Sequence, residues 1–273
     1  MQTGLFKARR FNATSSNDVN DTLTIEAPLQ ININSRPFTI TMRTPGDDLH
    51  LVRGLLFTEN IYIRASGYNF QERKARHSEF TYSVNFISDS ESIPTDLENR
   101  RSILSVSSCG ICGKKDLADL MQTAPPLKED FQINSTLLLA MFEKMNREQN
   151  TFNRSGGSHA AAAFDDLGKM LSIKEDIGRH NAVDKVIGML LCDGKLRAAK
   201  VLLVSGRVSF EIVTKAFMAK IPVLAAVSAP SSLAVETAGE MGITLAAFCR
   251  KNRITAYSHI SRIIEGKNAC QTI

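Results

Sequence analysis

The hydrophobic pattern of the chain changes its period between the two halves. From about residue 21 to 90, apolar and polar residues alternate in short segments, which is the two-residue period of strands with one buried face. The clearest strands are predicted at Leu29–Ile33 and Phe38–Met42, with a turn at Asn34–Pro37 between them. A helix is predicted next, with an apolar face formed by Leu49, Val52, Leu55 and Leu56. Two more strands are predicted, at Phe80–Phe86 and Arg101–Val106.

The second half alternates short, continuous apolar segments with amphipathic ones. Apolar segments of strand length are predicted at Met170–Ile173, Val201–Val204, Pro222–Val227 and Ile243–Phe248. Helices are predicted between them, from about residue 180 to 191, 210 to 219 and 231 to 241. Such an alternation is typical of βαβ units around a parallel sheet. The predicted fold class is therefore α/β: a mixed, largely parallel sheet flanked by helices, with a β-richer N-terminal part.

Composition divides the chain into three predicted segments. Residues 1–20, which lead into the polar stretch Ser15–Asp21, are predicted to be a flexible tail. Residues 21–124 form an N-terminal α/β part, and residues 125–273 form a C-terminal α/β part. The prolines in Ala124–Pro126 mark the boundary between these two parts.

The composition also indicates a cytoplasmic protein. The chain has 273 residues, of which 43% are hydrophobic, enough for a large core. Its longest apolar segments have the length of strands and are too short to span a bilayer, and the N-terminus lacks the apolar core of a signal peptide. Five cysteines, an odd number spread along a long chain, do not indicate a secreted disulfide framework. We therefore expect a cytoplasmic protein without a membrane segment.

The charge favours an anionic ligand. Lys and Arg number 33 against 28 Asp and Glu, which gives a formal net charge of +5. Nucleic acid is the less economical partner, because no basic run is interleaved with aromatic residues and the chain has no tryptophan. A nucleotide or another phosphate-bearing small molecule is favoured, although a basic surface that serves only solubility explains the charge equally well.

Cys109 and Cys112 are separated by two residues and lie between a strand-like and a helix-like segment. The start of a helix stabilises a thiolate, and the neighbouring Lys114 and Lys115 act in the same direction. A thiolate attacks sulfur, binds metal or carries a persulfide. The spacing therefore leaves three chemistries open: thiol–disulfide exchange, zinc binding and sulfur transfer.

A zinc site would need further ligands. His77 and Glu79 precede the cysteine pair in the order found in zinc deaminases. However, Ser108 stands where those enzymes have a proline, and His77 lies in a charged run rather than at a predicted helix start. No second Cys-x-x-Cys is present to complete a structural zinc site either. The sequence therefore favours a role without a metal.

Polar junctions, most of them with glycines, connect the strands and helices of the second half. They are Ser155–His159, Asp176–Asn181, Ser205–Ser209 and Ser228–Ser232. Helix-start amides, glycines and arginines together suit an oxyanion, and α/β sheets bind ligands where strand ends meet helix starts. Each junction alone is equally an ordinary helix cap, and His159 and His180 have either a ligand-facing or a local role. The presence of all four favours a shared cleft, while no Walker loop or Gly-x-Gly-x-x-Gly fingerprint is present.

Six regions of the chain, in order, resemble the formate dehydrogenase accessory sulfurtransferase family, commonly called FdhD. They are Ser108–Gly113, Ser155–Ala160, Glu175–Lys185, Ser205–Glu211, Ala229–Glu236, and Gly242–Leu245 with Phe248–Arg250. The resemblance covers about residues 20–258, and its long Glu175–Lys185 segment is highly specific. The chain departs from the family pattern at Ala219–Pro222 and Ile254–Ser258, so the cofactor-binding end is matched less closely than the cysteine end.

The resemblance implies a sulfur relay. Family members receive sulfur from a cysteine desulfurase as a cysteine persulfide. They pass it to the molybdenum or tungsten atom of a bis-molybdopterin guanine dinucleotide cofactor, which is then inserted into formate dehydrogenase. The resemblance also implies a homodimer and a fold related to cytidine deaminases without their catalytic metal site.

The expected site residues combine the resemblance with the residue chemistry. Cys109 matches the family's persulfide carrier, and Cys112 is expected to be an auxiliary thiol that helps to release sulfur or completes a disulfide afterwards. The residues expected to bind the cofactor are Phe248, Cys249, Arg250, Lys251, Asn252, Arg253, Arg179, His180 and Arg207. Cys192 and Cys249 lie in apolar surroundings and are expected to pack as small hydrophobic side chains.

Two functions of other classes stay open. A thioredoxin-like oxidoreductase would need a βαβ start around the cysteines and a reversible Cys109–Cys112 disulfide. A non-catalytic chaperone would bind the molybdenum cofactor without moving sulfur. We expect neither nucleic acid nor a membrane among the partners.

Overall fold

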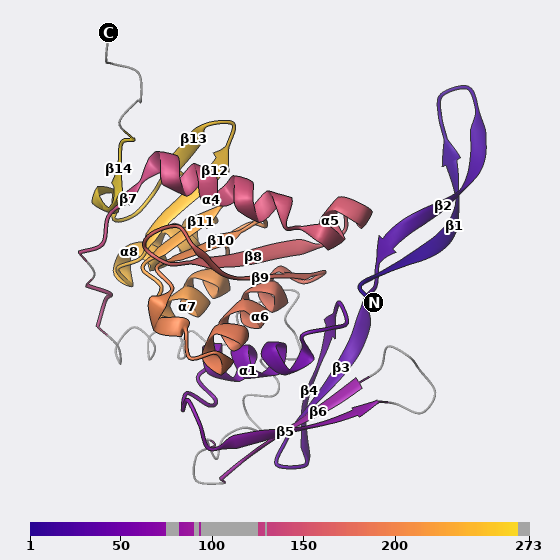
Figure 1. Ribbon diagram of the computed structural model, residues 1–273, viewed down its shortest axis with the longest axis horizontal. Coiled ribbons are helices and arrows are strands. Elements are labelled where there is room, and N and C mark those ends of the chain that lie inside the picture. The colour runs from indigo at the N-terminus through magenta and orange to yellow at the C-terminus, as the bar shows by residue number, and fades with distance from the viewer. Residues whose placement is uncertain (75–81, 90–92, 94–124, 129, 267–273) are drawn as a thin grey trace.

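Two sheets, each with helices of its own, make up the body of the molecule, as the computed structural model in Figure 1 shows. The structure describes residues 1–74, 82–89, 93, 125–128 and 130–266. The smaller sheet has four strands in the order β4-β3-β6-β5. These strands are β3 (Ala27–Ile33), β4 (Arg36–Arg43), β5 (Tyr68–Lys74) and β6 (Tyr82–Ser88).

The alternating pattern of the first half places one face of the smaller sheet against helix α1 (Asp48–Thr58). Every second residue of β3 is buried, because successive side chains of a strand point to opposite faces. Leu29 and Ile31 of β3 pack with Leu51 and Leu56 of α1 in one core, and all four are fully buried. The predicted strands and the predicted helix are therefore confirmed, but in β4 only Phe38 of the predicted apolar face is buried, whereas Ile40 and Met42 are 60% and 48% exposed.

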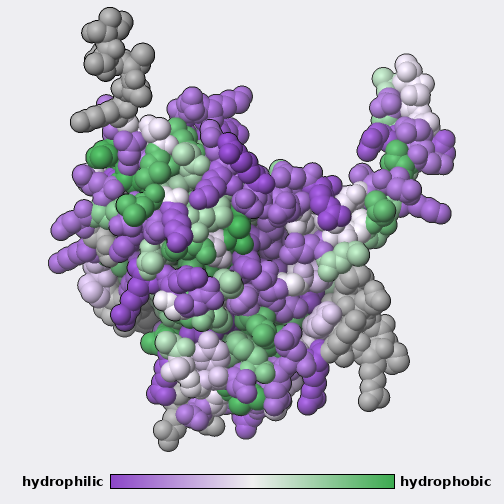
Figure 2. Space-filling view, viewed as in Figure 1, coloured by the Kyte–Doolittle hydropathy of each residue, from purple (hydrophilic) through white to green (hydrophobic). Residues whose placement is uncertain are grey.

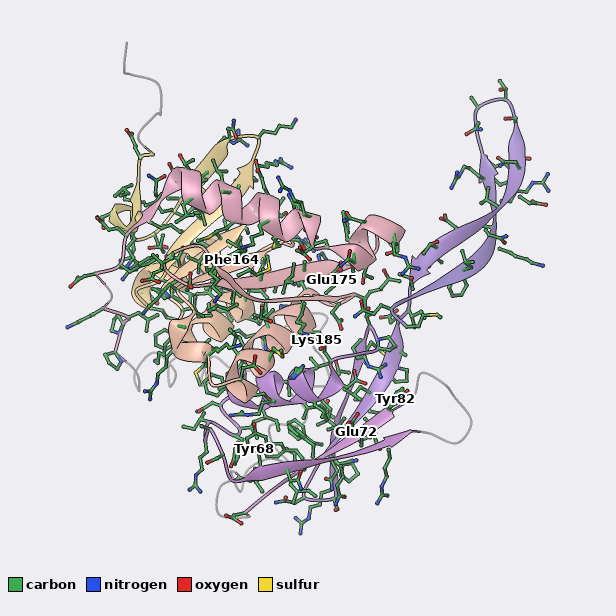
Figure 3. All side chains as sticks on the ribbon, in the orientation of Figure 1. Tyr68, Glu72, Tyr82, Phe164, Glu175 and Lys185 are labelled. Atoms are coloured by element: carbon green, nitrogen blue, oxygen red, sulfur yellow. The ribbon has the colours of Figure 1, made fainter. Side chains whose placement is uncertain are left out.

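Aromatic side chains complete this core. The ring of Tyr68 lies 5.3 Å from that of Phe86 and 5.7 Å from that of Tyr62, and Figure 3 shows Tyr68 at the foot of the molecule. The guanidinium carbon of Arg53 lies 4.9 Å from the Tyr68 ring centroid. Arg53 also donates to the carbonyl oxygens of Tyr62 and Arg64, so backbone carbonyls and aromatic faces stabilise this buried cation.

The larger sheet has six strands in the order β13-β12-β11-β10-β8-β9. They are β8 (His159–Phe164), β9 (Met170–Asp176), β10 (Val201–Val204), β11 (Val223–Ala226), β12 (Thr244–Arg250) and β13 (Arg253–Ala256). Strands β10, β11 and β12 are parallel, whereas β8, β9 and β13 pair antiparallel with their neighbours. The predicted mixed α/β class is confirmed, but the sheet is less parallel than predicted, because only its β10–β11 and β11–β12 pairings are parallel.

Helices cover both faces of the larger sheet. The longer described ones are α4 (Ser135–Arg147), α6 (Arg179–Cys192), α7 (Phe210–Met218) and α8 (Ser232–Glu240). Helices α6, α7 and α8 share a core with one face of the strands, and α4 packs on the other face. Both faces are therefore dry, which explains why β10 and β11 are continuously apolar rather than alternating. The short elements are α5 (Asn150–Ser155), β7 (Ile133–Asn134), β14 (Ile263–Ile264) and single 3₁₀ turns at Leu196–Ala198 and Ile260–Arg262.

Helix α1 joins the two parts by packing so closely against α6 that the two helix backbones are in contact. A Cβ atom on Gly54 of α1 would overlap the carbonyl oxygen of Asp184, and one on Gly188 of α6 would overlap that of His50. Only glycine permits so close an approach of two helices. The smaller sheet is thus fixed, through α1, to the helix that begins at the Asp176–Asn181 junction.

Residues 3–24 form a hairpin, whereas residues 1–20 were predicted to be a flexible tail and no strand was predicted there. Strands β1 (Thr3–Phe11) and β2 (Ser16–Thr24) pair antiparallel along their whole length, and the Asn12 N–H donates to the Ser15 carbonyl at 2.8 Å in the turn. The two strands were not predicted because the stretch is polar, and the backbone hydrogen bonds that pair them leave no hydrophobic pattern in the sequence. Figure 1 shows the hairpin standing out from the body.

Other differences concern elements that the sequence analysis omitted or that the structure does not describe. Helix α4 was not predicted, although it buries Leu138, Met141, Phe142 and Met145 on one face. The predicted strand Arg101–Val106 lies outside the described residues, and the domain boundaries stay predictions. None of the helices in the described ranges has both the length and the apolar character that crossing a membrane requires.

Candidate functional site

The four polar junctions lie side by side along one edge of the larger sheet. Strands β9, β10, β11 and β12 end at this edge, and β8 begins there, because β8 is antiparallel to both of its neighbours. The Ala160 N–H donates to Ser205 Oγ at 2.9 Å, and the Phe248 N–H donates to the Ser228 carbonyl at 3.2 Å. We call this row the carboxyl edge. It comprises Ser155–His159, Asp176–Asn181, Ser205–Ser209, Ser228–Ser232 and Phe248–Arg253.

A basic corner forms where β8, β10 and α6 meet. A Cβ placed on Gly206 would come within 3.2 Å of His159 Nδ1 and 3.4 Å of Arg179 Cβ. The absence of a side chain at Gly206 therefore allows His159 and Arg179 to pack closely against this backbone. Burial, and then the charges of Arg179 and Arg207, lower the pKa of His159, which keeps its imidazole neutral at neutral pH. Among the described residues, the buried Nε of Arg179 has no hydrogen-bond partner, and Arg207 is exposed. Two guanidinium groups beside a neutral imidazole suit an oxyanion.

His180 of α6 forms a second polar group with Ser209 and Glu211, which lie at the start of α7. Its Nε2 atom lies 3.3 Å from Ser209 Oγ and 3.9 Å from Glu211 Oε2. Burial, and then the charges of Lys215 and Arg179, lower the pKa of His180 to about 4. Burial raises the pKa of Glu211, but hydrogen bonds from Ser209 and from the residue's own backbone N–H outweigh it, so the net shift is downward. At neutral pH a neutral imidazole therefore faces an ionised carboxylate, and His180 adds hydrogen bonding without positive charge.

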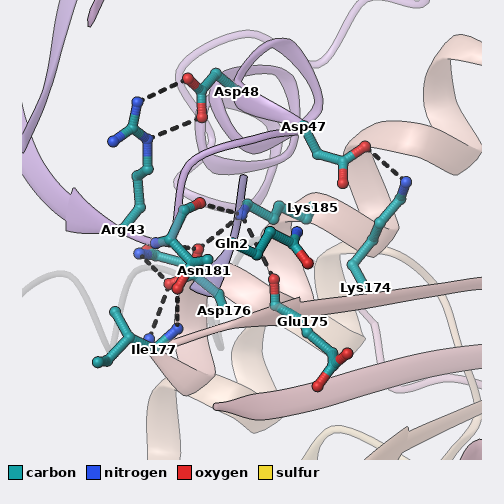
Figure 4. A network of polar contacts seen from close by, with 12 residues as sticks. Gln2, Arg43, Asp47, Asp48, Lys174, Glu175, Asp176, Ile177, Asn181 and Lys185 are labelled. Carbon is teal, nitrogen blue, oxygen red and sulfur yellow. Dashed lines mark hydrogen bonds and ion pairs between the residues drawn. The ribbon is translucent and has the colours of Figure 1, made fainter. Parts of the chain in front are cut away.

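The junction that carries Arg179 and His180 is held by a buried ion pair (Figure 4). Lys185 Nζ lies 2.7 Å from Asp176 Oδ2 and donates to the Thr44 carbonyl at 2.8 Å, and both charged side chains are fully buried. Asp176 also accepts from the backbone N–H of Gly178 at 2.8 Å and from the Asn181 amide at 3.1 Å. The carboxylate thus closes the turn that begins α6 and ties it to the smaller sheet.

Glu175 holds the neighbouring junction in the same way. Its carboxylate accepts from the backbone N–H groups of Thr151 and Phe152 at 2.7 and 2.8 Å, where α5 begins. It also accepts from the Ser158 hydroxyl at 2.8 Å. Charge-assisted bonds to a helix start are among the stronger ones. The position of Ser155–His159 is therefore fixed from the end of β9.

A second buried cluster lies deeper, between α1, α6 and α7. Lys215 Nζ donates to Asp184 at 3.0 Å, to Glu59 at 2.8 Å and to the Thr58 hydroxyl at 2.9 Å. Burial opposes the ammonium charge of Lys215, but Asp184 and Glu59 outweigh it and raise its pKa. Burial raises the pKa of Asp184 to about 6, so the carboxylate is still ionised at neutral pH. This cluster places α7, whose first turn carries Glu211, against α6.

The Glu175–Lys185 segment therefore divides its polar residues between two tasks. Glu175, Asp176, Asn181, Asp184 and Lys185 are buried and build the scaffold. Arg179 and His180 are the half-buried polar side chains of its α6 portion that reach the carboxyl edge. Arg179 and His180 were predicted from the sequence as site residues, whereas the buried scaffold residues were not predicted. The available signal was the placement of Asp184 and Lys185 between Val183 and Val186, within an otherwise apolar helix face.

The turn between β12 and β13 carries the remaining predicted cofactor residues. Arg250 pairs with Arg253 across the hairpin, and Lys251 and Asn252 between them have φ of 51° and 57°. Positive φ at both central residues is the pattern of a type I′ turn. Arg250, Lys251, Asn252 and Arg253 are exposed, and Phe248 is half-buried. The hairpin thus presents three cations at the end of the carboxyl edge.

Two cysteines differ in their surroundings. Cys249 packs with α4 in the core, and burial raises the pKa of its thiol to about 12. The Cys249 side chain is therefore packed in the core, as expected. Cys192, expected to be packed as well, is exposed at the end of α6, with its Sγ 3.9 Å from the Tyr68 hydroxyl. Cys192 is the last residue of α6 and its thiol lies at the surface, whereas Leu190, two residues earlier, is fully buried.

The predicted sulfur-carrying residues, Cys109 and Cys112, lie outside the described residues. His77 and Glu79, the further ligands of the zinc alternative, also lie outside them. Within the described ranges, no group of three or more His, Cys, Asp or Glu residues is placed to hold a metal ion. The carboxyl edge offers cations, amides and neutral imidazoles, which is the chemistry of an anion site.

Comparison with known proteins identifies close relatives. Residues 24–264 match the model of the FdhD/NarQ family. The chain is 44% identical to a sulfur carrier protein FdhD of Mycobacterium tuberculosis, over 89% of this chain and 92% of the relative. It is 41% identical to a sulfur carrier protein FdhD of Thermoplasma acidophilum, over 90% of this chain and 88% of the relative. A crystal structure of a protein from Desulfotalea psychrophila, described as a formate dehydrogenase accessory protein, has the same fold. The TM-score is 0.76 over 97% of this chain and 100% of that chain, and the sequence identity is 21%.

Proposed function

The chain belongs to the FdhD/NarQ family, and on that basis we propose that it is a sulfurtransferase that carries sulfur to the molybdenum cofactor of formate dehydrogenase. The observation that carries the proposal is the 44% identity, over 89% of the chain, to a protein named as a sulfur carrier. The sulfur comes from a cysteine desulfurase, and the recipient cofactor is a bis-molybdopterin guanine dinucleotide. The protein works in the cytoplasm as a homodimer.

Cys109 is the sulfur carrier in this proposal. Its thiolate attacks the outer sulfur of the donor's cysteine persulfide, the donor's S–S bond breaks, and the donor cysteine leaves as a thiolate. Cys109 then carries the persulfide. The Lys114 and Lys115 side chains that follow in sequence favour the thiolate form that this attack needs.

Cys112 releases the sulfur. Its thiolate attacks the inner sulfur of the Cys109 persulfide, a Cys109–Cys112 disulfide forms, and the outer sulfur leaves as hydrosulfide toward the bound cofactor. The two electrons that reduce the sulfane sulfur come from the thiol pair. A cellular dithiol reductant then restores both thiols for the next cycle.

The carboxyl edge binds the cofactor. Arg179 and Arg207 at the basic corner, and Arg250, Lys251 and Arg253 on the β12–β13 hairpin, face the phosphates of the guanine dinucleotides. One parallel strand, β11, separates β10 from β12, so the two basic groups suit a long ligand with several anionic groups. His159 and His180 are both neutral, so they add hydrogen bonds to the ligand but no further positive charge.

The direct test is activation of formate dehydrogenase in a host that lacks its own accessory protein. We expect the wild-type chain and the Cys192→Ala variant to restore activity, and the Cys109→Ala variant to fail. Cys192 is the matched control because it is an exposed thiol far from the proposed relay in sequence. Full activity of Cys109→Ala would show that the protein acts as a chaperone that moves no sulfur. A well-defined dithiol potential with reduction of insulin disulfides would favour an oxidoreductase.

A further inference from the structure

The carboxyl edge carries a partly exposed carboxylate, Glu211, close to the basic corner. Glu211 lies in the first turn of α7, directly after the Ser205–Ser209 junction, and its side chain is 36% exposed. Figure 2 shows mainly hydrophilic side chains at the end of the body near α5, where β8 begins and β9 ends. In a site for anions, an ionised carboxylate repels the negative groups of a ligand, so it is expected to serve a different part of that ligand.

The local contacts of Glu211 use only part of its hydrogen-bonding capacity. An ionised carboxylate has about four acceptor positions, and Glu211 accepts from the Ser209 hydroxyl and from its own backbone N–H. The Ser209 hydroxyl has a single proton, so its oxygen is the acceptor in the 3.3 Å contact with His180 Nε2. His180 Nε2 lies 3.9 Å from Glu211 Oε2, which is too long for a hydrogen bond. About two acceptor positions of Glu211 therefore stay open to a ligand.

Within the described part of the chain, no Lys or Arg forms an ion pair with Glu211. The charged partner within reach is His180, and burial keeps that imidazole neutral at neutral pH, with a pKa of about 4. Arg179 lies near enough to help lower the pKa of Glu211, but its buried Nε has no hydrogen-bond partner among the described residues. The carboxylate and the guanidinium are thus both available to a ligand at the same corner.

A heterocycle with two adjacent N–H donors suits the open positions of Glu211. Guanine presents a ring N–H beside its amino group, and a pterin presents the same 2-amino-4-oxopyrimidine edge. Two parallel N–H bonds to one carboxylate have the geometry with which the arginine fork binds a carboxylate. Adenine instead presents a ring-nitrogen acceptor at the corresponding position, and an ionised carboxylate repels it. The carboxylate therefore distinguishes between bases, which the cations of the site cannot do.

We propose that Glu211 determines the specificity of the carboxyl edge by accepting the ring N–H and the amino group of a 2-amino-4-oxopyrimidine edge, the edge that guanine and pterins share. The choice of ligand rests on the proposed function, because a bis-molybdopterin guanine dinucleotide contains both heterocycles. The cations of the basic corner and of the β12–β13 turn hold the phosphates of the same ligand. They supply affinity for any phosphate ester, whereas Glu211 selects the heterocycle.

The first experiment varies the ligand and keeps the wild-type chain. Inosine diphosphate lacks only the amino group of guanosine diphosphate, and adenosine diphosphate also lacks the ring N–H. Isothermal titration calorimetry is expected to show guanosine diphosphate binding about tenfold tighter than inosine diphosphate, and adenosine diphosphate binding weakest. 6-Hydroxymethylpterin and 6-hydroxymethyllumazine, which has an oxo group in place of the amino group, make the same comparison for the pterin.

The series that shows the preference identifies which heterocycle lies at Glu211. A tenfold preference within the nucleotides alone assigns guanine, and one within the pteridines alone assigns the pterin. Equal affinities within both series, or no binding of any probe, would overturn the proposal.

The second experiment changes the carboxylate. Glu211→Gln keeps the size of the side chain but replaces one acceptor oxygen with a donor, and an amide of this kind pairs with the adjacent donor and acceptor of adenine. We expect the ratio of the guanosine diphosphate affinity to the adenosine diphosphate affinity to fall about tenfold or more. A side chain that served only the start of α7 would weaken both nucleotides alike when changed. An unchanged ratio in a variant that circular dichroism shows to be folded would overturn the proposal.

Glu240→Gln is the matched control for this variant. Glu240 is exposed at the last residue of α8, whose first residue lies at the carboxyl edge, so Glu240 lies toward the opposite edge of the sheet. We expect its affinities for both nucleotides to equal those of the wild type. A fall in the ratio as large as that of Glu211→Gln would show that overall charge, rather than contact with the base, sets the preference, and would overturn the proposal.

Sulfur loading of the wild-type chain separates this proposal from the proposed function. Incubation with a cysteine desulfurase and cysteine measures the sulfur relay and involves no nucleotide. A chain that prefers guanosine diphosphate but accepts no sulfur would contradict the relay and support the role of Glu211. A chain that accepts sulfur on Cys109 but shows no preference in either ligand series would support the relay and overturn the role of Glu211.

Discussion

The two ends of the carboxyl edge use the same residue types for opposite purposes. At one end, Asp176 and Lys185 are fully buried, pair with each other and hold the start of α6. At the other end, Arg250, Lys251 and Arg253 are exposed on a two-residue turn, and none of them takes part in an ion pair within the described residues. A charge inside the body stabilises the position of the site, whereas a charge on the turn is free to meet a ligand. Burial therefore separates the scaffold from the binding surface, although both are rich in charge.

The largest expected effect is the loss of the buried pair. Changing Lys185→Met leaves the Asp176 carboxylate buried without its cation, and such a loss costs roughly 3–5 kcal/mol of unfolding free energy. Denaturant unfolding followed by circular dichroism measures it. Lys251→Met on the turn is the matched control, and we expect a change within about 0.5 kcal/mol.

A double variant sharpens this comparison. Lys185→Met combined with Asp176→Asn removes both charges, so we expect it to be more stable than Lys185→Met alone. Equal losses for Lys185→Met and Lys251→Met would contradict the division into scaffold and binding surface.

A pH dependence of stability is the next largest effect. Burial keeps His180 neutral in the folded protein with a pKa of about 4, against 6.5 for the free side chain. Between pH 6.5 and 4 the unfolded chain binds the proton that the folded one refuses, so stability falls as the pH falls through this window. The contribution of His180 at pH 4 is on the order of 2 kcal/mol, since each pKa unit corresponds to about 1.4 kcal/mol and the ring is partly solvated.

Urea unfolding at pH 7, 5.5 and 4.5 tests this directly. The His180→Gln variant should lose less stability on acidification than the wild type, while Arg250→Gln should follow the wild type. A wild-type stability that rises toward pH 4.5 relative to His180→Gln would mean that His180 is charged in the folded protein.

Changes on the exposed turn should affect binding and leave folding alone. Arg250→Gln or Arg253→Gln is expected to weaken binding of guanosine diphosphate about tenfold, because a hydrogen bond to a charged group contributes on the order of 1.5 kcal/mol. Isothermal titration calorimetry measures the affinity, and thermal unfolding should shift little. Lys169, which is exposed in the β8–β9 turn at the opposite edge of the sheet, is the control position as Lys169→Gln. Nucleotide binding that survives both turn variants unchanged would remove the hairpin from the site.

The smallest expected effect lies between the two ends. The Ser209 hydroxyl helps to hold the pKa of Glu211 down, so Ser209→Ala should raise that pKa while stability changes by about 1 kcal/mol or less. Carboxyl-selective NMR titration resolves the shift. An unchanged Glu211 titration would show that Ser209 bonds His180 instead.

The sequence predicted the elements whose signals are local. Strand β10 coincides with the apolar run Val201–Val204, and the polar junctions at the strand ends were visible because each combines small and polar residues next to an apolar segment. Lys185 was not recognised as part of the scaffold because one of its partners, Thr44, lies 141 residues away in the chain. The β1–β2 hairpin was missed because its nine residue pairs have little apolar content and therefore carry a weak pattern. Contacts between residues far apart in the sequence determine which charged side chains are buried, and only the exposed ones can bind a ligand.

The most direct test of the proposed sulfur relay is to map sulfur on the protein itself. The purified chain is incubated with a cysteine desulfurase and cysteine, alkylated and analysed by mass spectrometry of its peptides. The expected result is one added sulfur atom on the peptide that contains Cys109 and Cys112, located on Cys109, and none on the exposed Cys192 or in the Cys109→Ala variant. Sulfur found equally on Cys192 would mean unselective thiol chemistry. Its absence from Cys109 would contradict the sulfur-carrier function.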